Sequence, residues 1–335
     1  MLNIDGTALV RLVGVDPKDA NGRIHYRFGN CAVRTSLPLA SLRRPFDNIA
    51  LRTIDVDLID QGISSGAEWH HHWRDGDEVV LSLVRCDDDY WLRAPGVADF
   101  LIQMQLCRVQ VAPQPGMDAC TVEHLLVDQV LPRVLAQQGE TMVHASALSI
   151  GGRHALFLGP SGWGKSTLAG LLHRYGHVVL SDDCVQLVAE GNRFRAIPTY
   201  PSLRLYADSL DELFPGQVET APVASYTSKR RVPMEARHAP EQAVDAIYLL
   251  GDPAHADESI RIAPLRPAET CLALIRHSFR LDLGDRAASA AQLARCAEVA
   301  RSVPGFRLDY PRDFTRQGEL AEAVISHVAT LPALP

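Results

Sequence analysis

The residues best suited to chemistry form a glycine-rich run at 159–166, which reads Gly-Pro-Ser-Gly-Trp-Gly-Lys-Ser. The run fits the pattern G-x-x-x-x-G-K-[ST], and it lies between the apolar segment 155–158 and a segment with helical patterning. In such a loop, glycines let successive main-chain N–H groups turn inward around phosphate oxygens, and the following helix adds its positive end. Lys165 would reach the β- and γ-phosphates, and the Ser166 hydroxyl would bind Mg²⁺. We therefore expect ATP and Mg²⁺ as cofactors, held by Gly159, Ser161, Gly162, Trp163, Gly164, Lys165, Ser166 and Thr167.

Two adjacent carboxylates, Asp182 and Asp183, end the apolar segment 178–180, which follows the expected helix. Such neighbouring charges repel each other unless a cation or a proton lies between them. One of them can hold Mg²⁺, directly or through water, while the other accepts the proton of an attacking hydroxyl. Asp252, after the strand-like segment 246–250, is a second candidate, but a Gly-Asp-Pro turn explains it more simply. The pair is therefore the expected metal and acid–base site.

The elements that must hold these residues alternate between strand and helix. The apolar patterns predict strands at 142–150, 155–158 and 178–180, with a helix at 165–175 that Gly176 ends. Strand, loop, helix and strand in this order make a βαβ unit, which predicts an α/β domain with a partly parallel sheet. The C-terminal segment is predicted to be partly helical, with strands at 246–250 and 306–308 and helices at 287–301 and 319–328.

The first part of the chain, to about residue 112, is predicted to be β-rich. Alternating runs predict strands at 24–28, 51–58, 79–84 and 89–93, arranged as an antiparallel sheet or a small sandwich. The Pro- and Gly-containing segment 111–116 resembles a linker, after which Thr121 is predicted to cap a helix with an apolar stripe from Val122 to Leu135, ended by Gly139. We therefore expect a β-rich N-terminal domain at 1–115, suited to recognising an acceptor, and the catalytic domain at 116–335.

Composition places the chain in an ordinary class. Of its 335 residues, 47% are hydrophobic and 22% charged, which excludes a disordered or fibrous protein. The net charge of −7 argues against nucleic acid as a partner, and no apolar run is long enough for a membrane span. The sequence begins without a secretory pattern, and its seven cysteines are scattered, so we expect a cytoplasmic protein with reduced thiols.

Four features in order resemble the catalytic domain of HPr kinase/phosphorylase. They are His144, the glycine-rich run, the helix end Tyr175-Gly176-His177 and the sequence Val-Val-Leu-Ser-Asp-Asp at 178–183. The resemblance covers residues 140–190 and extends, with fewer matches, through 198–205 and the loop after Ser225. It implies an HPr-kinase-like α/β P-loop fold and a homo-oligomer.

The resemblance also implies roles for single residues. Lys165 and Ser166 would bind phosphate and Mg²⁺, and Asp182 and Asp183 would serve the metal and proton transfer. His144 would assist the acid–base pair; its alternative is a strand histidine packed at a sheet edge.

The chain departs from that family at three places, since Ala145 follows His144, Thr167 follows Ser166, and the Pro-Gly-Arg-Asn loop is missing. These departures argue against HPr as the acceptor. They favour the divergent HPr-kinase-related group, in which some members phosphorylate serine on ribosomally made peptides such as lasso peptides.

A basic loop at 225–233 is the one concentrated positive stretch in the chain. Lys229 and Arg231 can neutralise phosphate charge in the transition state, or they can contact an acceptor peptide. A solvated surface run is the alternative interpretation.

Taken together, the patterns predict a phosphotransferase that moves the γ-phosphate of ATP to a serine hydroxyl of a peptide or protein, including a lasso-type peptide. A small-molecule kinase, a nucleotide-dependent ATPase and a nucleotide-dependent binding module remain as alternatives. The transporter class of ATPase lacks support, because its Leu-Ser-Gly-Gly-Gln signature is missing from the sequence.

Overall fold

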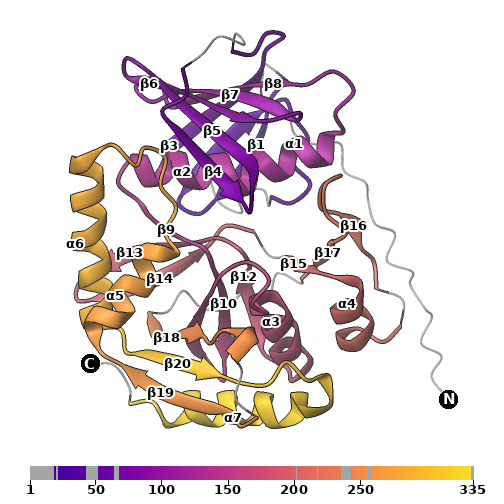
Figure 1. Cartoon of the computed structure of the whole chain (residues 1–335), viewed down its shortest axis with the longest axis vertical. Helices are drawn as coiled ribbons and strands as arrows, with labels where there is room; N and C mark the ends of the chain where they lie inside the picture. The colour runs from indigo at the N-terminus through magenta and orange to yellow at the C-terminus, as the bar shows by residue number, and fades with distance from the viewer. Residues whose placement is uncertain are drawn as a thin grey trace, which may run out of the picture.

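The computed structural model of the chain shows a mixed α/β protein built from several sheets and the helices that cover them (Figure 1). Figure 1 places the N-terminal sheet, drawn in purple, at one end of the molecule, with the other strands and helices below it. The residues that the structure describes are 19, 22–42, 52–63, 68–200, 202–216, 218–234, 243–255 and 258–332.

The N-terminal sheet has eight strands in the order β1-β2-β3-β8-β7-β6-β5-β4. These strands are β1 (Ile24–Phe28), β2 (Cys31–Thr35), β3 (Arg52–Leu58), β4 (His71–Asp75), β5 (Glu78–Cys86), β6 (Asp89–Ala94), β7 (Ala98–Gln103) and β8 (Arg108–Pro113). The strands predicted in this region therefore form, and Leu51, the first residue of one of them, lies outside the described residues.

The prediction of a purely antiparallel sheet or a sandwich is wrong at β3. This strand pairs in parallel with β2 on one side and with β8 on the other. Parallel neighbours need a connection long enough to return to the same edge of the sheet. The segments between Thr35 and Arg52 and between Leu58 and Arg108 are long enough for such connections. The alternation of apolar and polar residues within a strand does not show which strand it pairs with.

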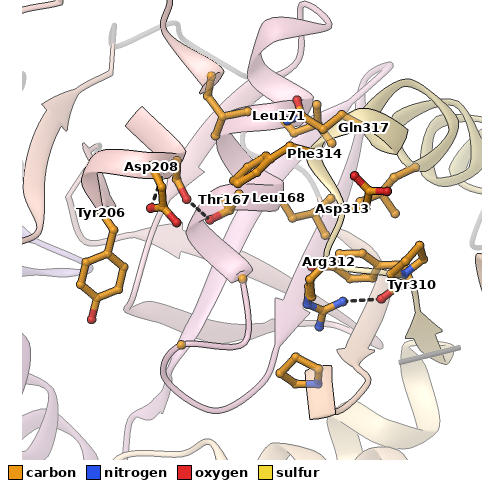
Figure 2. Close-up of a pocket in the computed structure, with 17 residues that line it drawn as sticks. Thr167, Leu168, Leu171, Tyr206, Asp208, Tyr310, Arg312, Asp313, Phe314 and Gln317 are labelled. Atoms are coloured by element: carbon orange, nitrogen blue, oxygen red, sulfur yellow. Dashed lines mark hydrogen bonds between the residues drawn. The ribbon is translucent and has the colours of Figure 1, made fainter. Parts of the chain in front are cut away.

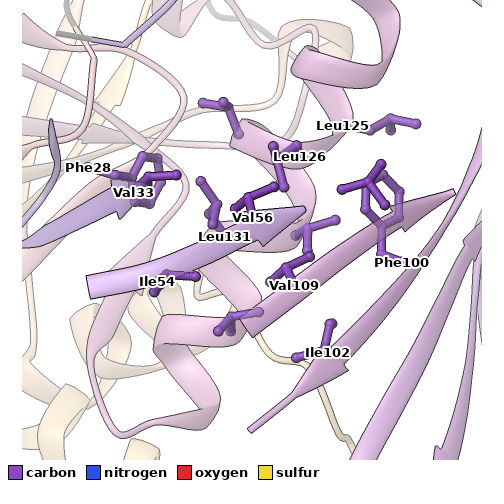
Figure 3. Packing of buried hydrophobic residues seen from close by; sticks show 14 of the residues in the cluster. Phe28, Val33, Ile54, Val56, Phe100, Ile102, Val109, Leu125, Leu126 and Leu131 are labelled. Atoms are coloured by element: carbon purple, nitrogen blue, oxygen red, sulfur yellow. The ribbon is translucent and has the colours of Figure 1, made fainter. Parts of the chain in front are cut away.

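One helical segment crosses a face of this sheet. It consists of α1 (Ala119–Leu125), a π-helical turn (Leu126–Val130) and α2 (Leu131–Gln137). Its apolar stripe packs on the strands in a common core, and Figure 3 shows Leu125, Leu126 and Leu131 beside side chains of the sheet such as Val56 and Val109. Because the helical segment follows residue 115, this core continues past the domain boundary that the sequence predicts.

The start of α1 differs from the prediction. Asp118 is the N-cap rather than Thr121, and its carboxylate accepts a hydrogen bond from the Thr121 amide at 2.8 Å. The Thr121 hydroxyl also donates to this carboxylate at 2.8 Å, so its oxygen does not cap the helix. The other end is as expected, since Gly139 follows α2 with φ 97°.

A central sheet of six strands has the order β12-β10-β11-β18-β20-β19. These strands are β10 (Ala145–Ile150), β11 (Arg153–Leu158), β12 (Val178–Ser181), β18 (Val244–Leu250), β19 (Arg261–Leu265) and β20 (Gly305–Asp309). β11, β18 and β20 run in parallel, and β10 lies antiparallel between β11 and β12. The predicted strand–loop–helix–strand unit is β11, α3 (Lys165–Arg174) and β12, and the partly parallel sheet is confirmed.

The single strand predicted at 142–150 is wrong, because the chain changes sheets at His144. Its first part is β9 (Thr141–Val143), in the small sheet β14-β13-β9 with β13 (Val185–Glu190) and β14 (Arg193–Pro198). The His144 amide donates to the carbonyl of His277 at 2.6 Å instead of to a strand of either sheet. His144 therefore lies where two sheets meet.

Side chains of the central sheet alternate between two cores, as the two-residue period of a strand requires. Phe157 packs in the core that contains α3 and α7 (Gln317–Thr330). Its neighbours Leu156 and Leu158 pack in the core that contains α5 (Pro267–Arg276) and α6 (Arg286–Ser302). The central sheet is thus covered by helices on both faces.

A short sheet lies beside α3 with α4 (Ala207–Leu213) (Figure 1). Its strands are β15 (Ser202–Leu205), β17 (Arg230–Pro233) and β16 (Ala221–Pro222). Single 3-10 turns span Pro253–His255 and Phe314–Arg316. Among the helices of the described residues, none combines the length and the apolar character that a membrane crossing needs.

Candidate active site

The glycine-rich loop connects the end of β11 to the first turn of α3. Gly162 and Gly164 have φ values of 80° and 92°, a left-handed conformation that favours glycine. A Cβ atom at Gly164 would also lie 3.0 Å from the Tyr310 hydroxyl. The backbone shape of this loop therefore depends on its glycines, and it ends at the helix N-terminus.

Lys165, the first residue of α3, is almost fully buried and directs its ammonium group onto the loop. Its Nζ donates to the carbonyl oxygens of Gly159 at 2.8 Å and Pro160 at 3.1 Å. Burial lowers the pKa of Lys165, while the charges of Asp183 and Asp182 act in the opposite direction. These carbonyl bonds are ones that an anion in the loop can replace.

Asp182 is fully buried behind the loop. One carboxylate oxygen accepts from the Ser146 hydroxyl, and the other, Oδ2, has no hydrogen-bond partner in the described part of the chain. Burial and the neighbouring Asp183 charge raise its pKa to about 6. The nearby hydroxyls of Ser146 and Ser166 lower this pKa. The Ser146 hydroxyl does so through its hydrogen bond, whereas the Ser166 hydroxyl lies close without a hydrogen bond to the carboxylate. An orphaned buried carboxylate oxygen near a serine hydroxyl suits a hard cation such as Mg²⁺.

Asp183 turns its carboxylate in a different direction from that of Asp182. It has φ 64°, a left-handed conformation that is uncommon outside glycine, and its Oδ2 accepts from Arg204 at 3.1 Å. Burial raises the pKa of Asp183, but the charge of Arg204, joined by that of His144 once its ring is protonated, outweighs this effect and holds the pKa below its usual value. The two adjacent acids thus have separate environments, one adapted to the protonated form and one to the ionised form.

His144 contacts Asp183 through both ring nitrogens. Nδ1 lies 2.8 Å from the Asp183 carbonyl oxygen, and Nε2 lies 3.9 Å from its carboxylate. Burial, followed by the charge of Lys165, lowers the pKa of His144 to about 4. The structure therefore brings His144, Lys165 and the acidic pair together, as the sequence predicts for one site.

A buried ionic network that the sequence analysis missed supports Asp183. Arg204, on β15, also bonds to both carboxylate oxygens of Asp128, which lies on the π-helical turn. The Tyr200 hydroxyl donates to the same carboxylate at 2.5 Å, and His124 is paired with it. The available signal was an aspartate within the apolar stripe of the predicted helix, a position that needs a buried partner.

Lys229 and Arg231, the two candidate residues of the basic loop, have different surroundings in the structure. Lys229 places its Nζ 5.1 Å from the centre of the Tyr206 ring, and its charge lowers the pKa of Lys165. It lines a cavity of about 310 Å³ together with Ser161, Asp183 and Arg204. Arg231 does not line this cavity, and its Nη1 is 3.5 Å from Glu123 on α1. The structure thus places Arg231 in an ion pair away from the site.

A second cavity, of about 270 Å³, lies along α3, and Tyr206 lines both cavities. Figure 2 shows Thr167, Leu168 and Leu171 on one wall, with Phe314 over them and Tyr310 beside Arg312. The Arg312 guanidinium lies 3.6 Å from the centre of the Tyr310 ring. It also donates to the carbonyl oxygens of Trp163 at 3.1 Å and Gly251 at 2.9 Å, so it ties this cavity to the loop.

Asp252, the alternative metal ligand, has a local role. Its carboxylate accepts from the Ala254 amide at 2.9 Å and pairs with His255 at 3.1 Å. The Gly-Asp-Pro segment is thus a turn, as the simpler interpretation of the sequence predicts.

Neither a protein-family model nor a curated protein matches the chain. Among solved structures, it is similar to the HPr(Ser) kinase/phosphatase from Coxiella burnetii, with 15% identity and a TM-score of 0.29. The similarity covers 56% of this chain and 95% of that one. A likeness this distant does not decide the function, which we therefore argue from the side chains of the site.

Proposed function

We propose that the protein is a kinase that uses ATP and Mg²⁺ to phosphorylate a serine hydroxyl of a peptide or protein, including a lasso-type peptide. The observation that carries the proposal is the pair Asp182 and Asp183: the Oδ2 atom of Asp182 is buried without a partner among the described residues, whereas Asp183 accepts from Arg204 and lines a cavity with Ser161 of the loop. A metal-binding acid and an ionised acid next to a phosphate-binding loop are the parts that hydroxyl phosphorylation needs.

Ser166 and Asp182 are the residues that would hold Mg²⁺. The orphaned Oδ2 atom of Asp182 fits this role, and no group of three His, Cys, Asp or Glu side chains in the described residues offers a fuller protein cage. Mg²⁺ commonly keeps several waters and binds phosphate oxygens, so few protein ligands suffice. When bound, the ion would neutralise charge that builds on the phosphates.

Asp183 is the residue that we assign as proton acceptor. The acceptor hydroxyl oxygen forms a bond to the γ-phosphorus, the bond from that phosphorus to the β-phosphate oxygen breaks, and the hydroxyl proton passes to the Asp183 carboxylate. In a loose transition state the hydroxyl loses its proton late, so a carboxylate with a lowered pKa is sufficient. Lys165 and Lys229 supply positive charge at the phosphates, and His144 and Arg204 position Asp183.

The cavity along α3 is our candidate for the nucleoside. Asp183, Ser161 and Lys229 line the first cavity, and this is where we place the transfer. The nucleoside would then occupy the neighbouring cavity, which Gly164 and Thr167 line and which shares Tyr206 with the first one. Phe314 and Leu168 give it apolar walls of the kind that a purine base requires (Figure 2).

The proposal also covers the location of the protein, its oligomeric state and the roles of its two domains. We expect it to act in the cytoplasm, where ATP and Mg²⁺ are available, as a homo-oligomer and without nucleic acid as a partner. The β-rich N-terminal domain, proposed at 1–115, would help to recognise the acceptor, and 116–335 would carry the catalysis.

Transfer of labelled phosphate tests the function directly. Purified protein is incubated with γ-labelled ATP, Mg²⁺ and a pool of serine-containing peptides, and the label on peptide is compared with ADP release. We expect Asp183→Asn to lower transfer by about a hundredfold or more while ATP binding persists. Asp88→Asn, which alters an exposed carboxylate in the β5–β6 turn, is the matched control and should keep full transfer. ADP release without labelled peptide would count against the kinase and favour an ATPase.

A further inference from the structure

A wide groove opens on the side of the loop where we place phosphate transfer. Its volume is about 1240 Å³, and Ser161, Trp163 and His144 form its inner end. Its other walls come from the helical segment 129–133, from strand β4, from the segment 265–283, from the end of β18 and from β20. Small-molecule sites usually enclose less than about 1000 Å³, so this size suits a peptide segment better.

Positive charge dominates the groove, although the chain as a whole carries a net charge of −7. The acidic side chains that line it are already paired, Asp252 with His255 at 3.1 Å and Glu269 with Arg266 at 3.0 Å. The basic side chains that line it are Arg74, Arg133, Arg276, Arg280 and Arg307. Arg307 is paired with Asp309, whereas Arg74, Arg133, Arg276 and Arg280 form no ion pair with a carboxylate in the part of the chain that the structure describes.

Arg133 is the unusual member of this set, because it is only 8% exposed. Its Nη1 donates to the main-chain and side-chain oxygens of Gln129, both at 2.8 Å. Its Nε is buried without a partner, and its Nη2 makes no hydrogen bond to any described residue. A buried guanidinium without a carboxylate is costly, so its unused donors on a groove wall indicate a site for an anion.

Aromatic rings fix the place of this guanidinium relative to the catalytic residues. It lies 5.0 Å from the centre of the Trp73 ring and 5.6 Å from that of Phe279. Phe279 also meets His144 edge to face, with ring centres 6.2 Å apart. One aromatic ring therefore separates Arg133 from the histidine that contacts Asp183.

We propose that this groove binds an acidic peptide segment of the acceptor, with one carboxylate of the peptide on Arg133 and further acidic groups near Arg276 and Arg280. This inference rests on the proposed kinase function and names the class of its acceptor. An extended peptide advances about 3.3 Å per residue, so the acidic residue lies within about three positions of the phosphorylated serine. Charge-assisted bonds from the planar guanidinium to the peptide carboxylate would give its free donors the partner that they lack among the described residues.

Binding of matched peptides without nucleotide tests the proposal. The probes are fluorescein-labelled Glu-Glu-Ser-Glu-Glu and its neutral counterpart Gln-Gln-Ser-Gln-Gln, and fluorescence anisotropy gives their affinities. We expect the acidic peptide to bind about tenfold more tightly or better, as one partly buried charge-assisted contact implies. Arg133→Gln should remove this preference, whereas Arg85→Gln should retain it. Arg85 is the matched control, since it also lies over an aromatic ring, that of Tyr90, but does not line the groove.

The peptide-binding experiment has outcomes that would overturn the proposal. Equal binding of the two peptides, or a preference that survives Arg133→Gln, would overturn the proposal. If Arg133→Gln does not fold, as judged by circular dichroism, Arg280→Gln takes its place, because this side chain is less buried and should weaken the preference. Competition by inorganic phosphate that matches the affinity of the acidic peptide would show a small-anion site and also overturn it.

The kinase proposal is judged separately in the same preparations. Tight, Arg133-dependent binding without phosphate transfer would reject the kinase and support the anion site. Transfer to acidic and neutral peptides at equal rates would support the kinase and reject the role of the groove.

Discussion

The Nδ1 atom of His144 lies 2.8 Å from the main-chain carbonyl oxygen of Asp183. Because a carbonyl oxygen only accepts hydrogen bonds, this nitrogen must carry the proton. With a pKa lowered to about 4 by burial, the ring is neutral near pH 7, and its lone pair is on Nε2, on the side of the Asp183 carboxylate. His144 therefore holds the backbone of Asp183 and adds no positive charge to the site at neutral pH.

This arrangement predicts how stability depends on pH. Below its ordinary pKa of 6.5, His144 of the unfolded chain binds a proton, whereas the folded chain resists it until about pH 4. The free energy of unfolding should thus fall as the pH drops from 6.5 toward 4, by about 1–3 kcal/mol for this group. Urea denaturation at a series of pH values measures the effect, and His144→Gln should reduce the slope.

A matched substitution checks this assignment. Leu293 is 53% exposed and does not titrate, so Leu293→Ala should leave the pH slope as it is in the wild type. His277, whose pKa burial also lowers to about 4, should contribute in the same direction. If His144→Gln and Leu293→Ala gave the same slope, the neutral state of the half-buried His144 would be refuted.

Asp182 should show a conflict between stability and function. Burial raises the pKa of Asp182 to about 6, so the folded protein favours the protonated carboxyl. The resulting stabilisation is complete below the ordinary pKa of 3.8 and is lost as the pH rises through 6. Near pH 8 the buried charge is destabilising, and Asp182→Asn should raise the free energy of unfolding by on the order of 1–3 kcal/mol. The same variant should lose phosphate transfer and need far more Mg²⁺.

Thermal melting at pH 8 and a Mg²⁺ titration of transfer measure the two effects. A less stable Asp182→Asn would show that this carboxylate is satisfied within the fold, and the metal role would then lose its support. Asp88→Asn is a suitable comparison, because this exposed carboxylate lies in the β5–β6 turn, away from both cavities.

Local sequence patterns could predict only part of this site. The glycine-rich loop and the pair at the end of β12 depend on residues close in sequence, so pattern and structure agree there. Arg204 and Asp128 could not be linked in this way, because a buried ion pair between a strand and a helix depends on tertiary packing. The break of the strand at His144 has a similar cause, since the hydrogen bonds from this segment go to residues near His277.

Errors elsewhere in the fold have comparable physical reasons. Asp118 and Thr121 are both good caps, and only the geometry of the turn selected the aspartate. The parallel pairs of β3 reflect long connections, about which the alternation of a strand says nothing. For Arg133, the sequence shows a basic residue in a helix, and its burial between two aromatic rings appears only in three dimensions.

A substitution at Phe314 tests whether the cavity along α3 binds the nucleoside. It is 38% exposed and packs over α3, so Phe314→Ala should change folding stability little (Figure 2). Removing this wall should raise the KM for ATP by about tenfold while kcat changes less, since base contacts are made equally in ground and transition states. Steady-state kinetics with varied ATP measure both constants. Leu293→Ala, at a residue 53% exposed on α6, is the control, and an unchanged KM in Phe314→Ala would place the base elsewhere.

Substitutions in the ion pair between Arg204 and Asp128 can distinguish an effect on folding stability from an effect on catalysis. Asp128→Asn leaves a buried guanidinium with one carboxylate fewer, so the free energy of unfolding should drop by about 3 kcal/mol. The double variant Asp128→Leu with Arg204→Met replaces the charges by apolar groups, and it should recover much of that loss. Chemical denaturation of both variants gives these energies.

Phosphate transfer should not recover with stability in the double variant. Arg204 also bonds to Asp183 at 3.1 Å, and its charge helps to lower the pKa of that carboxylate. Without it, the Asp183 carboxylate protonates more easily, so the acid limb of the pH profile of kcat should move to higher pH. Full recovery of transfer with an unmoved acid limb would show that Arg204 serves folding alone, and Asp183 would then be positioned by His144 without it.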